Sequence, residues 1–141
     1  NLDINYLNEL SDDHLKNKAQ SYDVVLGLEI IEHVRTPENF VNGLMKLAKP
    51  NGLVIFSTLN RTAKSFILGI VAAEYILKWL PKGTHTWKSF VKPCELARWA
   101  RQSGGRPVDI SGIVYNPTCQ TFSLSKTDTS NNYILTTVCE M

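Results

Sequence analysis

The stretch YDVVLGLEIIEHVRTPENFVNGLMKLAKPNGLVIFST, residues 22–58, decides the fold that this sequence predicts. It begins and ends with β-branched apolar runs, Tyr22–Leu28 and Leu53–Thr58, which are typical of strands buried in a parallel sheet. Between them, Thr36 and Pro37 mark the start of a helix whose apolar residues recur at helical spacing. A strand, a helix and a second strand with short joins predict one right-handed crossover unit of an α/β fold.

A ligand site is expected at one edge of this sheet. Ligands of open parallel sheets bind beyond the carboxyl ends of the strands. This rule places Leu28, Glu29 and Glu32 on one side of the expected site and Thr58 and Asn60 on the other.

The remaining predicted elements flank the crossover unit. Strands are expected at residues 2–7, 108–115, 121–124 and 133–138, a helix at 94–102, a tight turn at 49–52 and at most one helical turn within 8–20. The late strands pair by hairpins, so the sequence predicts a mixed sheet with an antiparallel edge.

Size and composition exclude several classes of protein. The chain has 141 residues, which suits one domain, and its net charge of +2 is too small to indicate a nucleic-acid partner. Cys94, Cys119 and Cys139 are widely spaced and include no CxxC pair, which argues against a disulfide scaffold or a structural zinc site.

An apolar segment, SFILGIVAAEYILKWL at residues 65–80, leaves three interpretations open. It would span ~24 Å as a helix, which is short for crossing a bilayer. Lys64, Lys78, Trp79 and Lys82 lie at or near its ends, as in a helix that rests in a membrane surface. A lid over an apolar substrate and a buried core helix also fit, and periodicity alone favours the core helix.

The motifs of this chain resemble those of a known enzyme family. YDVVLGLEIIEHV and KPNGLVIFSTLNRT resemble the middle of class I S-adenosylmethionine-dependent methyltransferases, which have a Rossmann-like fold. AAEYILKWLPKGTHTWKSFVKP, VYNP and NNYIL resemble the ubiquinone-biosynthesis O-methyltransferases. The resemblance implies that residues 1–141 are the carboxyl-terminal portion of one such domain, with a membrane or lid insertion at about 62–92.

This resemblance implies a function. Family members use S-adenosylmethionine to methylate ring hydroxyls on polyprenylated catechol-type intermediates of ubiquinone, including 3-demethylubiquinol. The family's Gly-rich loop and the acidic residue after its second strand are absent, so we expect this fragment alone to bind donor poorly and to be inactive. Two alternatives are another small-molecule class I methyltransferase and a catalytically silent lipid-binding or assembly module.

The resemblance also implies partners and a location. A polyprenylated phenol or quinol substrate, a membrane surface and other ubiquinone-biosynthesis proteins are the expected partners, and no nucleic acid is expected. The substrate class and the basic excess of residues 61–101, eight basic against two acidic, favour peripheral membrane association. The expected location is the matrix side of the mitochondrial inner membrane in a eukaryote, or the cytoplasmic side of the inner membrane in a bacterium.

Glu29, Glu32 and His33 are the candidate catalytic residues. Their i, i+3, i+4 spacing would put them on one face of a helical turn, where they could hold Mg²⁺. Without a metal, His33 is the candidate general base or orients its loop. The resemblance implies that Glu29, Glu32 and His33 are metal ligands and that Leu28 contacts the methyl donor.

Three further residues have two interpretations each. Asn60 and Arg61 follow the second strand, where they contact substrate or form a turn with a surface arginine. His85 lies in a basic loop and either lines the substrate entrance or holds that loop by hydrogen bonds.

Overall fold

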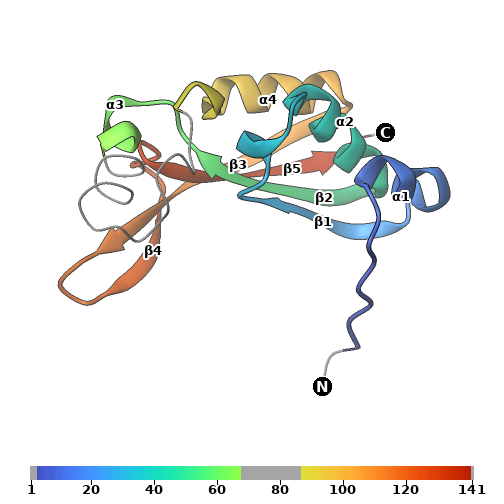
Figure 1. The fold of residues 1–141 in the computed structure, drawn as a ribbon, viewed down its shortest axis with the longest axis horizontal. Coiled ribbons are helices and arrows are strands. Elements are labelled where there is room, and N and C mark those ends of the chain that lie inside the picture. The colour runs from blue at the N-terminus through green and yellow to red at the C-terminus, as the bar shows by residue number, and fades with distance from the viewer. Residues whose placement is uncertain (1–2, 68–86, 141) are drawn as a thin grey trace.

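The computed structural model describes residues 3–67 and 87–140, and Figure 1 shows their arrangement. In chain order the elements are α1 (Ser11–Lys18), β1 (Tyr22–Leu28), η1 (Ile31–His33), α2 (Pro37–Leu47), β2 (Ala48–Leu59), α3 (Ala63–Ser65), η3 (Trp87–Ser89), α4 (Pro93–Gln102), β3 (Gly105–Asn116), β4 (Thr121–Ser125) and β5 (Asn132–Cys139).

The strands form one mixed sheet in the order β1-β2-β5-β3-β4. β1 and β2 are parallel, whereas β5 is antiparallel to both β2 and β3, and β4 is antiparallel to β3. The predicted crossover unit and antiparallel edge are confirmed, as is the helix expected at residues 94–102.

The predicted turn at residues 49–52 is an irregularity within a strand. β2 begins at Ala48, and its register against β1 shifts between the pairs Tyr22–Ala48 and Val24–Leu53. Asn51, with a φ of 64°, accommodates the extra residues in the left-handed region. Thr36 occupies the predicted N-cap position of α2, but its side chain forms no capping hydrogen bond.

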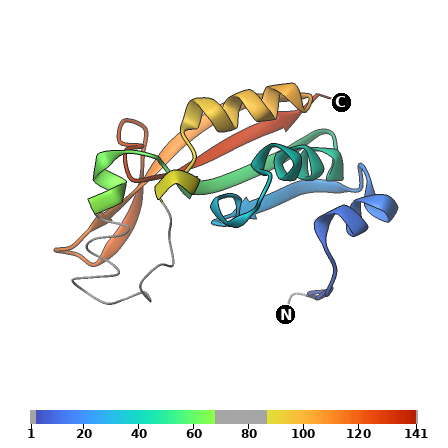
Figure 2. The same ribbon diagram turned by 45° about the horizontal axis from the view of Figure 1, so that its top comes forward.

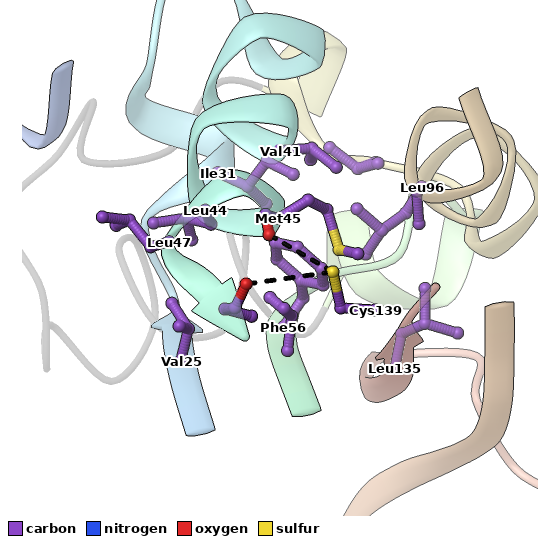
Figure 3. Packing of buried hydrophobic residues seen from close by; sticks show 14 of the residues in the cluster. Val25, Ile31, Val41, Leu44, Met45, Leu47, Phe56, Leu96, Leu135 and Cys139 are labelled. Atoms are coloured by element: carbon purple, nitrogen blue, oxygen red, sulfur yellow. Dashed lines mark hydrogen bonds between the residues drawn. The ribbon is translucent and has the colours of Figure 1, made fainter. Parts of the chain in front are cut away.

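The hydrophobic core lies between the sheet and helices α2 and α4, which cover the same face (Figure 2). Met45 of α2, Phe56 of β2 and Leu96 of α4 are fully buried and converge there (Figure 3). Cys139 also lies in this core, with its Sγ 3.7 Å from the carbonyl oxygen of Met45 (Figure 3). The core therefore fixes the two helices relative to the ends of β1 and β2.

The opposite face of β1 is exposed in the described part of the chain. Val25 and Gly27 are buried beneath α2, while the alternating side chains of Val24, Leu26 and Leu28 are exposed. The prediction that β1 is a fully buried strand is therefore wrong for this face, because the covering helix packs on the other one.

The predicted strand at residues 2–7 is also wrong for the residues that the structure describes. Residues 3–7 form neither helix nor strand, and the segment runs away from the sheet (Figure 1). Alternating polarity stabilises a strand only when a neighbouring strand satisfies its backbone. The following polar stretch forms the eight-residue helix α1, which is longer than the single turn expected.

Candidate functional site

The carboxyl ends of β1 and β2 meet at one edge of the sheet, as the parallel pairing requires. Leu28 at the end of β1 pairs in register with Ser57 of β2. The Leu28 side chain is 45% exposed and lies on the uncovered face. It is therefore accessible at the edge where the sequence predicts a donor contact.

Glu29 is held in an unusual backbone conformation at this edge. Its φ is 50°, a left-handed value that costs a non-glycine residue about 1–2 kcal/mol. Ser57 holds the residue in place: the Glu29 amide donates to the Ser57 carbonyl oxygen at 3.0 Å, and Ser57 Oγ donates to Glu29 Oε1 at 2.7 Å. The strand end and the carboxylate are thus fixed together.

Glu32 is anchored separately by the next residue of β2. It is 7% exposed, and its Oε2 accepts a hydrogen bond from Thr58 Oγ1 at 2.8 Å. Ser57 and Thr58 are consecutive in a strand, so their side chains leave opposite faces of the sheet. The carboxylates of Glu29 and Glu32 are therefore anchored on opposite faces.

The expected helical turn that joins Glu29, Glu32 and His33 is not formed. Only Glu32 and His33 lie within η1, and the left-handed Glu29 precedes it. Within residues 3–67 and 87–140, no group of three or more His, Cys, Asp or Glu side chains is placed to hold a metal ion. As placed, these residues do not fit the predicted Mg²⁺ site.

His33 ends η1 at the surface of the same edge. Its side chain is exposed, and its backbone amide donates to the Ile30 carbonyl oxygen at 2.9 Å. An imidazole at this position is accessible to a ligand beyond the strand ends, which suits a proton acceptor.

Asn60 has a structural role in the described chain. Asn60 is buried, and its side-chain Nδ2 donates to the Thr129 carbonyl oxygen at 2.9 Å. Its backbone amide donates to the Asn131 carbonyl oxygen at 2.7 Å. These bonds fix the end of β2 to residues 128–131, the loop that precedes β5.

The next two cationic candidates, Arg61 and Lys64, are paired with carboxylates. Arg61 Nη2 contacts both carboxylate oxygens of Glu95 on α4. Lys64 Nζ donates to Asp128 Oδ2 at 2.8 Å. Hydrogen bonds, first from Lys64 and then from Ser130, hold the pKa of the Asp128 carboxyl below its usual value. Lys78, Trp79, Lys82 and His85 lie outside the described residues.

A cavity of about 290 Å³ lies on the helix-covered side of this edge, and two of the predicted site residues, Glu32 and Arg61, line it. It is bounded by residues 31–37, which include η1, by Arg61 beyond the end of β2, by the segment before α4 and by α4 itself. Its lining is Ile31, Glu32, Val34, Arg35, Pro37, Arg61, Lys88, Ser89, Phe90, Val91, Glu95 and Trp99.

Comparisons with known proteins agree with this architecture. A family model described as a methyltransferase domain matches residues 3–109. A methyltransferase structure from Thermotoga maritima superposes with a TM-score of 0.61 at 17% identity, covering 88% of this chain and 58% of that one. Magnesium protoporphyrin IX methyltransferase from Synechocystis gives a TM-score of 0.52 at 18% identity, covering 89% and 48%. At these identities the structures show the fold alone.

Curated relatives are more similar in sequence. The ubiquinone biosynthesis O-methyltransferase of Cereibacter sphaeroides is 45% identical over 137 residues, which are 97% of this chain and 55% of the relative. That of Bordetella pertussis is 53% identical over 116 residues, or 82% and 48%. The chain thus spans about half the length of these relatives. The resemblance predicted from the motifs is confirmed, and the chain belongs to the methyltransferase domain family, with an incomplete class I fold.

Proposed function

We propose that this chain forms the acceptor-side part of an S-adenosylmethionine-dependent O-methyltransferase of ubiquinone biosynthesis. Its substrates would be ring hydroxyls of polyprenylated catechol-type intermediates, with conversion of 3-demethylubiquinol to ubiquinol among the steps. The identity of 44–53% to curated relatives of that name, over 82–97% of this chain, carries the proposal.

Leu28 fits a contact with the donor. Leu28 and Ile30 present exposed apolar surface beside the carboxyl end of β1, where ligands of such sheets bind. These side chains would contact the uncharged parts of S-adenosylmethionine. When bound, the donor supplies an electrophilic methyl group on a positively charged sulfur.

His33 is the proposed general base. A phenolic hydroxyl has a pKa of about 10 and is mostly protonated at neutral pH, so its oxygen needs a proton acceptor when it attacks the methyl group. His33 would take the hydroxyl proton as that oxygen forms its bond to the methyl carbon. A positioned base of this kind contributes roughly 10²–10⁴-fold to the rate. Mg²⁺ has no part in this proposal, because Glu29 and Glu32 are anchored apart.

Peripheral membrane association is the proposed role of the insertion at about 62–92. Its two ends meet: the rings of Phe66 and Trp87 are 6.4 Å apart, and Trp87 Nε1 donates to the Thr62 carbonyl oxygen at 3.0 Å. Phe66 and Trp87, the described residues on either side of positions 68–86, therefore lie side by side. Within residues 3–67 and 87–140, no helix is long and apolar enough to cross a membrane.

Co-sedimentation with vesicles tests the membrane proposal. The intact chain and a variant with residues 68–86 replaced by a short Gly-Ser linker would be mixed with neutral and anionic vesicles. Binding that rises with anionic lipid and is lost in the variant supports the proposal, and binding indifferent to both contradicts it. The proposed location, the matrix or cytoplasmic side of an inner membrane, and contact with other ubiquinone-biosynthesis proteins depend on this result.

A methyl-transfer assay tests the enzymatic proposal. The longest reading frame that contains this chain would be incubated with labelled S-adenosylmethionine and a short-tailed demethylubiquinol, beside the 141-residue chain alone. We expect transfer by the longer protein and little by the chain alone. Donor binding without transfer would favour another small-molecule methyltransferase. Vesicle binding without donor binding would favour a silent lipid-binding module.

A further inference from the structure

Strand β4 forms one edge of the sheet and leaves its outer side exposed. Within residues 3–67 and 87–140, β3 is the only strand that pairs with β4. The β3–β4 hairpin projects from the sheet, away from α1 (Figure 1). The outer side of such an edge presents a row of backbone amide and carbonyl groups, which a further strand can satisfy. The edge therefore specifies an extended segment as its partner.

The hairpin also exposes apolar side chains on one face. Phe122 and Leu124 are two residues apart in β4, so both leave the same face, and they are 71% and 66% exposed. Tyr115 of β3 pairs in register with Phe122, and their ring centroids are 4.9 Å apart. Exposed apolar side chains grouped beside an open strand edge mark an interaction surface.

This edge lacks the features that usually prevent strands from pairing with one another. Natural edge strands are kept apart by charged residues, prolines or bulges. No charged residue occurs between Asp109 and Lys126, and the sequence of β4, TFSLS, contains no proline. The pairing of β3 with β4 has no register shift, so no bulge bends the edge away. The strand is thus open to pairing with an uncharged strand.

We propose that β4 pairs with β4 of a second copy of this chain, antiparallel and centred on Ser123. The two sheets then continue into one another across a two-fold axis. In this register Phe122 of each copy lies opposite Leu124 of the other, and Ser123 lies opposite Ser123. Apolar side chains therefore meet apolar ones, and polar side chains meet polar ones, which stabilises a strand pair.

The charges beside β4 favour this partner and this direction. Lys126 follows the strand and forms an ion pair with Asp109. In the antiparallel register Lys126 lies opposite Gln120 of the second copy, so no like charges meet. A parallel register would place the two Lys126 side chains next to each other, which is unfavourable. Because a two-fold interface uses the same edge of both copies, the assembly closes as a dimer.

The contact is small, so the dimer should be reversible. Each copy contributes a strand of five residues. Such a pair is expected to bury less than the roughly 1,200 Å² at which stable interfaces begin. Association should therefore depend on protein concentration, unlike that of an obligate dimer.

Sedimentation of the longest reading frame that contains this chain tests the proposal. We expect a monomer at low concentration and a dimer as the concentration rises. Ser123→Lys places two like charges opposite each other at the centre of the contact, so this variant should remain monomeric. Gln102→Lys is the matched control, because it adds the same charge at an exposed position of α4, and it should dimerise like the unchanged protein.

A second variant measures the apolar contribution. Phe122→Ser removes the pair with Leu124 twice in a symmetric dimer, so it should weaken association by roughly tenfold. Circular dichroism checks that each variant is folded.

A disulfide locates the contact independently of these variants. Ser123→Cys would be made in a protein whose exposed Cys94 and Cys119 are replaced by serine. Opposite Cβ atoms of paired strands are about 4.5–5.5 Å apart, which is close to disulfide geometry. We expect oxidation to link two copies of this variant. Leu26→Cys in the same background is the control, because Leu26 is exposed on β1 at the other edge of the sheet, and it should stay unlinked.

Three results would overturn the inference: a monomer at every concentration, a dimer that Ser123→Lys does not alter, or cross-linking through Leu26→Cys in place of Ser123→Cys. A monomer whose binding to neutral vesicles is lost in Phe122→Ser would also overturn it, and would assign the hairpin to a membrane surface. None of these measurements involves methyl transfer, so their outcome is separate from that of the proposed function.

Discussion

Gly112→Ala should be one of the most damaging single-atom additions in this chain. Gly112 of β3 lies against residues 128–131, and a Cβ built on it overlaps the Asp128 carbonyl oxygen, 2.6 Å from the Asp128 carbonyl carbon and 3.1 Å from Thr129 Cα. The obstacle is backbone, which cannot rotate away as a side chain can. The loop must therefore move away from β3 or the strand must bend.

The cost follows from what that loop holds. Three hydrogen bonds reach this loop from the residues that follow β2. Asn60 Nδ2 donates to the Thr129 carbonyl oxygen at 2.9 Å, and the Asn60 backbone amide donates to the Asn131 carbonyl oxygen at 2.7 Å. Thr62 Oγ1 donates to the Ser130 carbonyl oxygen at 2.5 Å. At about 0.5–1.5 kcal/mol each, the loss of all three would lower the free energy of unfolding by about 1.5–4.5 kcal/mol. Arg61 follows Asn60, so the cavity should lose its shape as well.

Urea unfolding followed by circular dichroism measures this cost. Gly43→Ala is the matched control, because a Cβ at Gly43 in helix α2 meets only Asp12 Oδ1 at 3.7 Å. Alanine favours a helix by about 1 kcal/mol over glycine, so this variant should be slightly more stable than the unchanged chain. Gly112→Ala unfolding within about 0.5 kcal/mol of the unchanged chain would refute the argument from backbone overlap.

Four further outcomes are expected. Tyr133→Phe should lower the free energy of unfolding by about 1 kcal/mol, because the buried phenol donates to the Val91 carbonyl oxygen at 3.1 Å. Burial also raises the pKa of this phenol, so it stays protonated and able to donate. Thermal unfolding measures the loss, and an unchanged unfolding midpoint would contradict the prediction. His33→Gln should reduce methyl transfer by the longest reading frame by roughly 10²–10⁴-fold, with donor binding retained; full activity would exclude His33 as the base. EDTA should leave that transfer unchanged, and a loss restored by Mg²⁺ would refute the structural argument against a metal site. The pKa of Asp128 is lower in the folded protein than its usual value of 3.8, so the pair with Lys64 stabilises the fold above pH 3.8. This contribution is lost as the pH falls through the lower, folded pKa. A Lys64→Gln variant should therefore lose stability at pH 7 and match the unchanged chain in strong acid, and an equal loss at both pH values would contradict the pairing.

The parts predicted correctly from sequence are those fixed by local patterns. Apolar runs and helical spacing located β1, α2 and β2, because each buries one continuous surface against the same core. The strand expected at residues 2–7 failed because a strand also needs a neighbour, and alternation says nothing about where that neighbour lies. The register irregularity at Asn51 likewise depends on how β1 meets β2 and not on either segment alone.

The candidate site was predicted in position but not in geometry. The carboxyl ends of β1 and β2 do bring Glu29, Glu32 and Asn60 to one edge. The i, i+3, i+4 argument assumed helical backbone at Glu29, and no feature of the sequence marks the left-handed φ there. The cavity was missed for a different reason: Arg61, Lys88 and Trp99 come from separate segments that only the packing of α4 against the sheet brings together.

The exposed Leu28 side chain and the cavity beside η1 lie on opposite sides of the sheet edge, and the segment from Glu29 to Glu32 connects the two sides. Leu28 is on the uncovered face, whereas the cavity is on the face covered by α2 and α4. The segment that begins at Glu29 must cross from one face to the other within a few residues, and the left-handed turn held by Ser57 begins that crossing. The strained backbone of Glu29 is thus explained by this crossing, which places the carboxylates of Glu29 and Glu32 on opposite faces of the sheet.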